Sequence, residues 1–554
     1  MKKNSLIFRA SGTILAACAA IALSACSPKK DAPLSSVIPE NSTFALYSKT
    51  DKAQAEALRA RADYKEVIAA LKADKVLKKK YADFQKTIPE KFAAVLNMFV
   101  DKDDIAGSIE CLTFGGIDES VIYTPLVLKE ENGHPEGTAI IKTASADFAD
   151  KIWKAVSSIS DAKAVKIDNA DALEIALPKE EGEIDIKIFV CKKTPHIIAA
   201  FSREEVETAL KNLREPPKKS IRDDKYFSRV VPNADVMSWA FFSPKFVGEN
   251  AKSFSDNVEA VGFSAGKSTL SEYNIEVCLL FKEKSPMPAF FSTCSFCSSK
   301  LTESAVESPT MFMALALPQL TEKLIKNIEA KGLDMSDFTK NPYGKVLLNN
   351  LKSVAASVGK IDVPAMFQGK QPSGIVNFEV ADADKILNAP EFAQMLAAYP
   401  KKEIGKIECR EIPNVGLLAK ISNKRISLLL GSEAEKLIDV ASGKTATKSA
   451  GVEKLLNAVK SKGGFFEFYA DYNAFLQMQL QMSEQMRKQM IAAGQTPPPQ
   501  SEMMDKYYKI LASLCKKYEI SCNISSQGDT VRLKMHGECE LDLFPAAKAI
   551  REMK

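Results

Sequence analysis

The chain has 554 residues, of which 46% are hydrophobic and 26% charged. This composition is typical of a folded globular protein and excludes a largely disordered one. The net charge of +5 is too small to predict a nucleic-acid partner. Three histidines and two tryptophans leave little material for histidine-based metal sites or aromatic sugar platforms, and no cofactor is expected.

The chain begins with a segment typical of an export signal, residues 1–25. Three positive charges lie in its first nine residues, and residues 10–25 carry no charge. The segment ends in Leu23-Ser24-Ala25-Cys26, which resembles the lipobox of bacterial lipoproteins. In that family a peptidase cuts before the cysteine, and the new N-terminal cysteine carries the acyl chains.

The resemblance places the lipid on Cys26. Leu15-Ala16-Ala17-Cys18 fits the same short pattern, but cleavage there would leave the apolar residues 19–23 exposed, whereas Cys26 begins a polar tether, residues 26–36. An ordinary signal peptide with a chance cysteine is the alternative. We therefore expect a protein of the bacterial cell envelope, held on a membrane through its N-terminal lipid. An aspartate after the cysteine retains enteric lipoproteins in the inner membrane, so Ser27 favours the outer membrane.

Residues 37–285 predict a first α+β repeat. Polar and apolar residues alternate from Ile184 to Ile188, as in a half-buried strand, and a turn then leads into a second strand at 196–201. Ser202 and Glu205 follow with the spacing of a capping box, which starts a helix. The other expected elements are a strand at 43–47, helices within 53–100, a strand after Gly137, a helix at 148–156, a strand at 236–242 and a hairpin at 259–280.

The residues Gly262-Phe263-Ser264-Ala265-Gly266 match G-x-S-x-G, the pattern around the nucleophile of many serine hydrolases. That site needs a strand, a tight turn and a helix, whereas the residues after Gly266 read as another strand. We therefore predict a hairpin turn here and no catalytic residue. The overlapping Gly266-Lys267-Ser268 lacks the earlier glycine of a phosphate-binding loop, because Val261 stands in its place.

Residues 286–304 predict a linker between two repeats, because serines gather there just after two prolines interrupt the pattern. The linker contains a C-x-x-C pair, Cys294 and Cys297. A redox pair would lie at the start of a helix, so a local disulfide or buried thiols are expected instead. The mature chain has nine cysteines besides Cys26, and their connectivity stays open. No second pair lies nearby, so no zinc site is predicted.

Residues 305–554 predict a second α+β repeat, because five landmarks of the first half recur in the same order. Gly374 precedes a strand and a helix as Gly137 does, and Ser432 with Glu435 repeats the capping-box spacing. Hairpins beside helices, without regular strand-helix-strand alternation, favour mainly antiparallel sheet in both repeats. The other recurrences are strands at 310–315, 416–421, 426–430 and 465–469 and a hairpin at 520–541.

The second repeat also carries an expected helical insertion, about residues 472–500. Its methionines recur every four residues, so they share one face of the helix: Met478, Met482, Met486 and Met490. A packing face or a partner-docking face is the preferred interpretation, because methionine makes such surfaces adaptable. A copper site, for which soft thioethers are suited, is the alternative.

The order of these landmarks resembles uncharacterised exported bacterial proteins made of two tandem α+β repeats, each opening with a proline, small polar residues and a strand. Ile38-Pro39-Glu40-Asn41-Ser42-Thr43 and Val231-Pro232-Asn233-Ala234 fit that opening. The resemblance implies no activity. We predict a non-enzymatic binding or scaffolding module for an envelope protein partner. A periplasmic carrier of a lipid or other apolar ligand is the first alternative, and a hydrolase using Ser264 is the second.

We predict that Cys26 is acylated and that Cys18 leaves with the signal peptide, because only cleavage before Cys26 produces a polar N-terminus. Metabolic labelling with a fatty-acid analogue should mark the wild-type protein and the Cys18→Ser variant. Labelling should disappear in Cys26→Ser. Label that survives Cys26→Ser and is lost in Cys18→Ser would place the anchor at the other cysteine.

Overall fold

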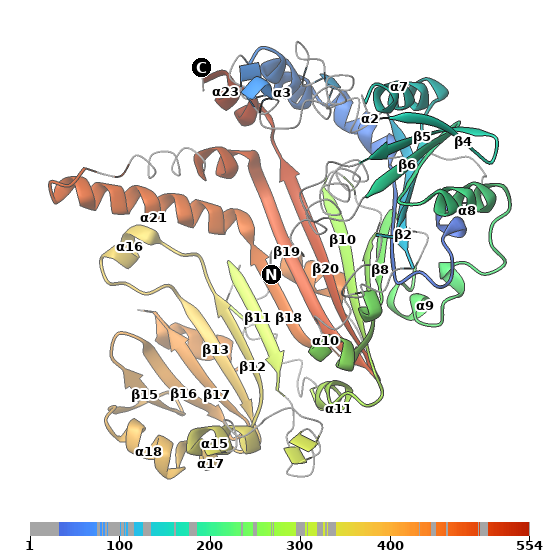
Figure 1. Cartoon of the computed structure of the whole chain (residues 1–554). Coiled ribbons are helices and arrows are strands. Elements are labelled where there is room, and N and C mark those ends of the chain that lie inside the picture. The colour runs from blue at the N-terminus through green and yellow to red at the C-terminus, as the bar shows by residue number, and fades with distance from the viewer. Residues whose placement is uncertain are drawn as a thin grey trace. The chain divides into compact units, whose positions relative to one another are not determined.

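The computed structural model consists of two compact units (Figure 1). The first unit comprises residues 1–270 and 543–554, and the second comprises residues 271–542. The residues described are 33–74, 78–79, 81–83, 86, 100, 105, 107–108, 116–125, 135–159, 162–176, 186–233, 236–246, 252–266, 269, 271–294, 305–306, 309–317, 325–326, 329–330, 340–431, 433–444, 450–460, 464–496, 498 and 508–552.

Strands of the first unit pair only in the antiparallel sense, in the order β4-β5-β6-β7-β3-β2-β1-β8-β9. They are β1 (Phe44–Lys49), β2 (Ile117–Thr124), β3 (Thr138–Thr143), β4 (Lys163–Ile167), β5 (Ala170–Ala176), β6 (Lys187–Lys193), β7 (His196–Ala200), β8 (Ser238–Phe242) and β9 (Val258–Ala265). The helices are η1 (Leu34–Val37), α2 (Lys52–Ala60), α3 (Ala62–Lys72), α7 (Ala146–Ser157), α8 (Arg203–Arg214), η2 (Ile221–Asp223), α9 (Phe227–Val230), α10 (Lys252–Asn257) and α23 (Phe544–Glu552).

Strands of the second unit are also antiparallel, in the order β14-β15-β16-β17-β13-β12-β11-β18-β19-β20-β10. They are β10 (Glu272–Phe281), β11 (Met311–Ala316), β12 (Leu351–Val358), β13 (Gly374–Val380), β14 (Lys401–Ile404), β15 (Ile407–Ile412), β16 (Gly416–Ser422), β17 (Arg425–Leu430), β18 (Gly464–Asp471), β19 (Cys515–Gln527) and β20 (Thr530–Leu541). The helices are α11 (Met287–Phe291), α15 (Pro342–Asn350), α16 (Val363–Phe367), α17 (Ala383–Leu387), α18 (Pro390–Ala397), η4 (Ala434–Lys436), α19 (Leu437–Ala441), α20 (Ala450–Val459) and α21 (Tyr472–Ala492).

Helices and antiparallel strands together confirm the predicted α+β class. The boundary between the units falls at residues 270 and 271, ahead of the expected linker 286–304. Part of that linker forms α11, and Phe291 stacks on Phe465 of β18 with ring centroids 5.2 Å apart. β10 pairs along its length with β20, so the second unit includes a strand that the sequence places in the first repeat.

The core of the first unit forms where small helices cover the inward side chains of the central strands. Trp239 of β8 is fully buried. It stacks on Tyr47 of β1 and receives the edge of Phe227 of α9, with ring centroids 5.7 and 4.8 Å away. α7 packs Ala149 against β5 to β7 in the same unit (Figure 1). In the second unit, Leu455 of α20 packs with Phe312 and Tyr469.

The chain closes the first unit with its own C-terminal segment. Leu543 donates its backbone N–H to the Asp63 carboxylate at 2.9 Å, just before α23, which packs on α3. Arg61 contacts the same carboxylate at 2.6 Å, and this guanidinium lowers the pKa of Asp63 to about 2. Arg551 and Glu66 form a further ion pair between the two helices. The last residues therefore belong to the fold that the first residues begin.

The predicted hairpin turn at Gly262–Gly266 is wrong. Residues 262–265 continue strand β9, and Ser264 lies opposite Trp239 of β8. The first glycine of the motif has a packing reason, because a Cβ atom at Gly262 would lie 2.2 Å from the carbonyl oxygen of Val230. Only glycine lets β9 approach α9 this closely.

We predict that Gly262→Ala lowers the free energy of unfolding by about 1–3 kcal/mol, the usual cost of forcing an extra atom into a packed site. Chemical denaturation of the purified protein measures it. Gly137→Ala is the matched control, since its Cβ atom would have no contact closer than 3.6 Å. Equal stability losses in the two variants would contradict the close-packing explanation.

Candidate ligand-binding site

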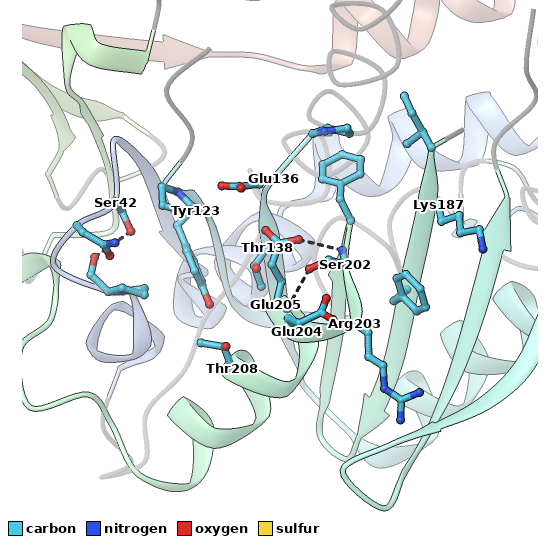
Figure 2. Close-up of a pocket in the computed structure, with 17 residues that line it drawn as sticks. Ser42, Tyr123, Glu136, Thr138, Lys187, Ser202, Arg203, Glu204, Glu205 and Thr208 are labelled. Carbon is cyan, nitrogen blue, oxygen red and sulfur yellow. Dashed lines mark hydrogen bonds between the residues drawn. The ribbon is translucent and has the colours of Figure 1, made fainter. Parts of the chain in front are cut away.

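The first unit contains a cavity of about 920 Å³, partly open to solvent (Figure 2). It lies between the loop before β1, the end of β2, the start of β3, strand β6 and the first turns of α8. Small-molecule sites commonly have volumes of about 300–1,000 Å³. The cavity is therefore large enough for a small organic ligand.

Glu205 fixes the helix that forms one side of this cavity. Its backbone N–H donates to the Ser202 hydroxyl at 3.1 Å, and its carboxylate accepts the Ser202 N–H at 2.9 Å, which completes the predicted capping box. The other carboxylate oxygen accepts the Gly137 N–H at 2.6 Å (Figure 2). Burial raises the pKa of Glu205, although these backbone hydrogen bonds oppose the shift.

The walls of the cavity are mainly apolar. Phe189 of β6, Phe201 before α8 and the ring of Tyr123 contribute aromatic faces, and Ile186 and Pro39 add aliphatic surface. These side chains come from segments far apart in the sequence. They form one apolar surface because β6, β7, β3 and β2 are consecutive strands of the sheet. Such a surface favours the apolar part of a ligand.

Tyr123 places a polar group in this apolar surrounding. The residue is 4% exposed, and its buried hydroxyl lies beside the Thr138 side chain, whose hydrogen bond lowers the pKa of Tyr123. Thr138 pairs with Tyr123 across β2 and β3 and lines the same cavity. Burial raises the pKa of Tyr123 well above its usual range, and the Glu205 carboxylate raises it further. The hydroxyl is therefore neutral and able to accept or donate a hydrogen bond.

The two positively charged side chains of the cavity form ion pairs, and the carboxylates of the lining outnumber them. Arg203 binds Glu207 at 3.1 Å and the Lys166 carbonyl at 2.7 Å. Lys187 binds Glu174 at 2.6 Å. Both cations of the lining are thus paired with groups outside it, whereas three carboxylates belong to the lining: Glu136, Glu204 and Glu205. The cavity carries an excess of negative charge.

The structure brings few of the residues singled out from sequence to this site. Ser202 and Glu205 line the cavity, but Ser264 lies in β9 and is not part of the lining. Four singled-out residues lie outside the described part of the chain: Cys18, Cys26, Cys297 and Ser432. Tyr123 and Phe189 were not predicted as site residues. One signal was available for Tyr123. It lies two residues after the buried Val121 in β2 and so on the same face of the strand, and its side chain ends in a polar hydroxyl.

The cysteines within the described ranges show no redox arrangement. Seven of them form no disulfide: Cys191, Cys278, Cys294, Cys409, Cys515, Cys522 and Cys539. Burial raises the pKa of the Cys294 thiol to about 11, whereas a reactive thiol needs a lowered pKa. Across residues that the structure describes, no three histidine, cysteine or acidic side chains are grouped to hold a metal ion. No described helix is both long and apolar enough to cross a membrane.

The second unit contains a separate polar cluster on α20, β19 and β20. Glu538 lies 2.6 Å from Lys454 and 2.7 Å from Lys517, and these ammonium groups lower the pKa of Glu538 to about 2. Lys517 also contacts Glu519 at 2.8 Å. Opposite charges on neighbouring strands stabilise the pairing of those strands. The charges of the cluster therefore pair with one another across α20, β19 and β20, and the cluster does not require a ligand.

We predict that Ser202→Ala lowers the free energy of unfolding by about 1 kcal/mol, because the Glu205 N–H loses its acceptor at the helix N-terminus. Thermal or chemical unfolding measures the change. Ser202→Thr is the matched control, since threonine keeps a capping hydroxyl and most of the stability. An alanine variant as stable as wild type would show that this cap contributes nothing to the fold.

Comparisons with known proteins do not add a family to this geometry. No family model, curated protein or solved structure matches the chain. The features that bear on function are therefore the cavity, the sequence pattern of residues 1–26 and the arrangement of strands in the two units.

Proposed function

We propose that this protein is a non-enzymatic binding module of the bacterial cell envelope, anchored by a lipid on Cys26, and that its first unit binds a small, largely apolar molecule. The observation that carries the proposal is the cavity of about 920 Å³ with aromatic walls. The N-terminal lipobox pattern supports the anchor, and Ser27 supports an outer-membrane destination. Of the two binding roles considered from sequence, the cavity favours the carrier.

The proposal includes a tandem duplication of one α+β repeat. Its support is the order in which the strands pair. In the first unit this order is β4-β5-β6-β7-β3-β2-β1-β8-β9. The second unit contains the matching order β14-β15-β16-β17-β13-β12-β11-β18-β19, in which each label is higher by ten. The central strands follow the same rule, since β1 pairs with β2 and β8, and β11 pairs with β12 and β18. Under this proposal the two repeats have diverged, and the cavity is a property of the first.

A scaffolding role is the second candidate, supported by helix α21. Figure 1 shows this helix extending beyond the strands of the second unit. Phe475 and Met486 are 42% and 55% exposed. Leu476 of the same helix is buried. Exposed apolar side chains on one helix can form a docking face for another protein. The proposal assigns no catalytic role to Ser264, because β9 does not lead into the strand-turn-helix arrangement of a nucleophile.

We predict that the mature chain, residues 27–554 without lipid, binds the apolar fluorophore N-phenyl-1-naphthylamine with increased, blue-shifted emission. Thr208→Trp should weaken binding at least tenfold, because the indole would fill the cavity from an exposed position on α8. Fluorescence titration measures the affinity. Lys211→Trp, which adds the same ring to α8 outside the cavity, should bind as wild type does.

Circular dichroism should show the same helix content in both tryptophan variants. Absence of binding to the wild-type chain, or equal binding by Thr208→Trp and wild type, would count against the cavity as the binding site. Native mass spectrometry of protein purified from the cell envelope provides an independent readout. A co-purifying small molecule supports the carrier, and a co-purifying protein supports the scaffold.

A further inference from the structure

We infer that the cavity of the first unit takes a cationic amphiphile, with an ammonium head near Tyr123 and Glu205 and an apolar body against Phe189 and Phe201. This inference rests on the proposed function, because it names the class of ligand for the same cavity. It depends on three features of the lining: the buried hydroxyl of Tyr123, an excess of negative charge and aromatic faces.

The Tyr123 hydroxyl lies beside Thr138 and keeps hydrogen-bonding capacity that this contact does not use. Leaving the capacity of a buried polar group unmet is costly. Tyr123 lines the cavity, and Figure 2 shows its side chain running toward the first turns of α8. A ligand with an N–H donor would satisfy the phenolic oxygen. The neutral state of this phenol makes the oxygen a suitable acceptor.

The charge of the lining selects the sign of the head group. Glu136, Glu204 and Glu205 belong to the lining, and its two cations are paired with Glu207 and Glu174 outside it. A cation entering the cavity is attracted by these carboxylates, whereas an anion is repelled by them. The half-buried position of Glu205 reduces screening by solvent around it. A fatty acid or another anionic amphiphile is therefore the disfavoured ligand.

The aromatic residues suit both parts of such a ligand. Phe189, Phe201 and the Tyr123 ring offer apolar surface for a hydrocarbon body. The faces of the same rings attract an ammonium group through cation–π interaction. The acidic and aromatic side chains thus favour an ammonium head group, and the apolar surface of the cavity favours a hydrocarbon chain attached to it. The structure assigns no further polar subsite to the ligand.

The test compares three ligands with the same chain length and different heads: dodecylammonium, dodecanol and laurate. Each competes with N-phenyl-1-naphthylamine for the mature chain below its micellar concentration. Dodecylammonium should displace the fluorophore at concentrations at least tenfold lower than dodecanol, and laurate should be the weakest competitor. Raising the salt concentration should weaken displacement by dodecylammonium most.

Two variants test the residues. Tyr123→Phe should weaken displacement by dodecylammonium about fivefold, because it removes the hydroxyl and keeps the ring. Glu136→Gln combined with Glu204→Gln should reduce the preference for dodecylammonium over laurate. Glu215→Gln, at an exposed site at the other end of α8, is the control for removing a carboxylate outside the cavity and should leave the preference intact.

The outcomes separate the two levels of the proposal. If the fluorophore binds but laurate or dodecanol competes as well as dodecylammonium, the cationic ligand class is overturned and the apolar carrier stands. Unchanged competition by dodecylammonium in Tyr123→Phe would also overturn the inference. If the fluorophore does not bind the wild-type chain at all, the carrier and the ligand class fail together.

Discussion

The hydrogen bonds of one half-buried carboxylate hold the candidate site together. Glu205 accepts N–H groups from Ser202 on its own helix and from Gly137 at the start of β3. These bonds join the beginning of α8 to the sheet and leave Phe201 and Tyr123 lining the space between them. The same carboxylate, together with burial, keeps the neighbouring phenol neutral. One side chain therefore caps a helix, positions a cavity wall and sets the electrostatic character of the site.

Antiparallel pairing sets the wider arrangement in both units. In the first, residues near 123, 138, 189 and 201 meet because β2, β3, β7 and β6 are successive neighbours. In the second, the corresponding order brings together charged residues of β19 and β20, which neutralise one another. Antiparallel pairing thus brings different chemistry together in the two units. The first unit leaves a cavity with a buried hydroxyl, and the second contains a cluster of paired charges.

The sequence predicted local structure better than the site. The alternation of polar and apolar residues and the Ser202–Glu205 spacing each depend only on residues that are close together in the sequence. For this reason β7 and the capping box were predicted correctly. The end of β9 was not, because glycine normally weakens a strand and the reason for Gly262 is its contact with Val230, thirty-two residues earlier. The cavity depends on strand pairing between residues as far apart as Pro39 and Thr208. No local pattern records which strands become neighbours.

The return of the C-terminal segment to the first unit imposes an order on biosynthesis. The chain is made from its N-terminus, so residues 271–542 are complete before Leu543 can reach Asp63. The unit that begins first is completed by a later segment of the chain, and the face of α3 that α23 covers stays open until residues 544–552 have been made. A ribosome that stops before residue 544 would release a chain with an intact second unit and a first unit lacking its closing helix.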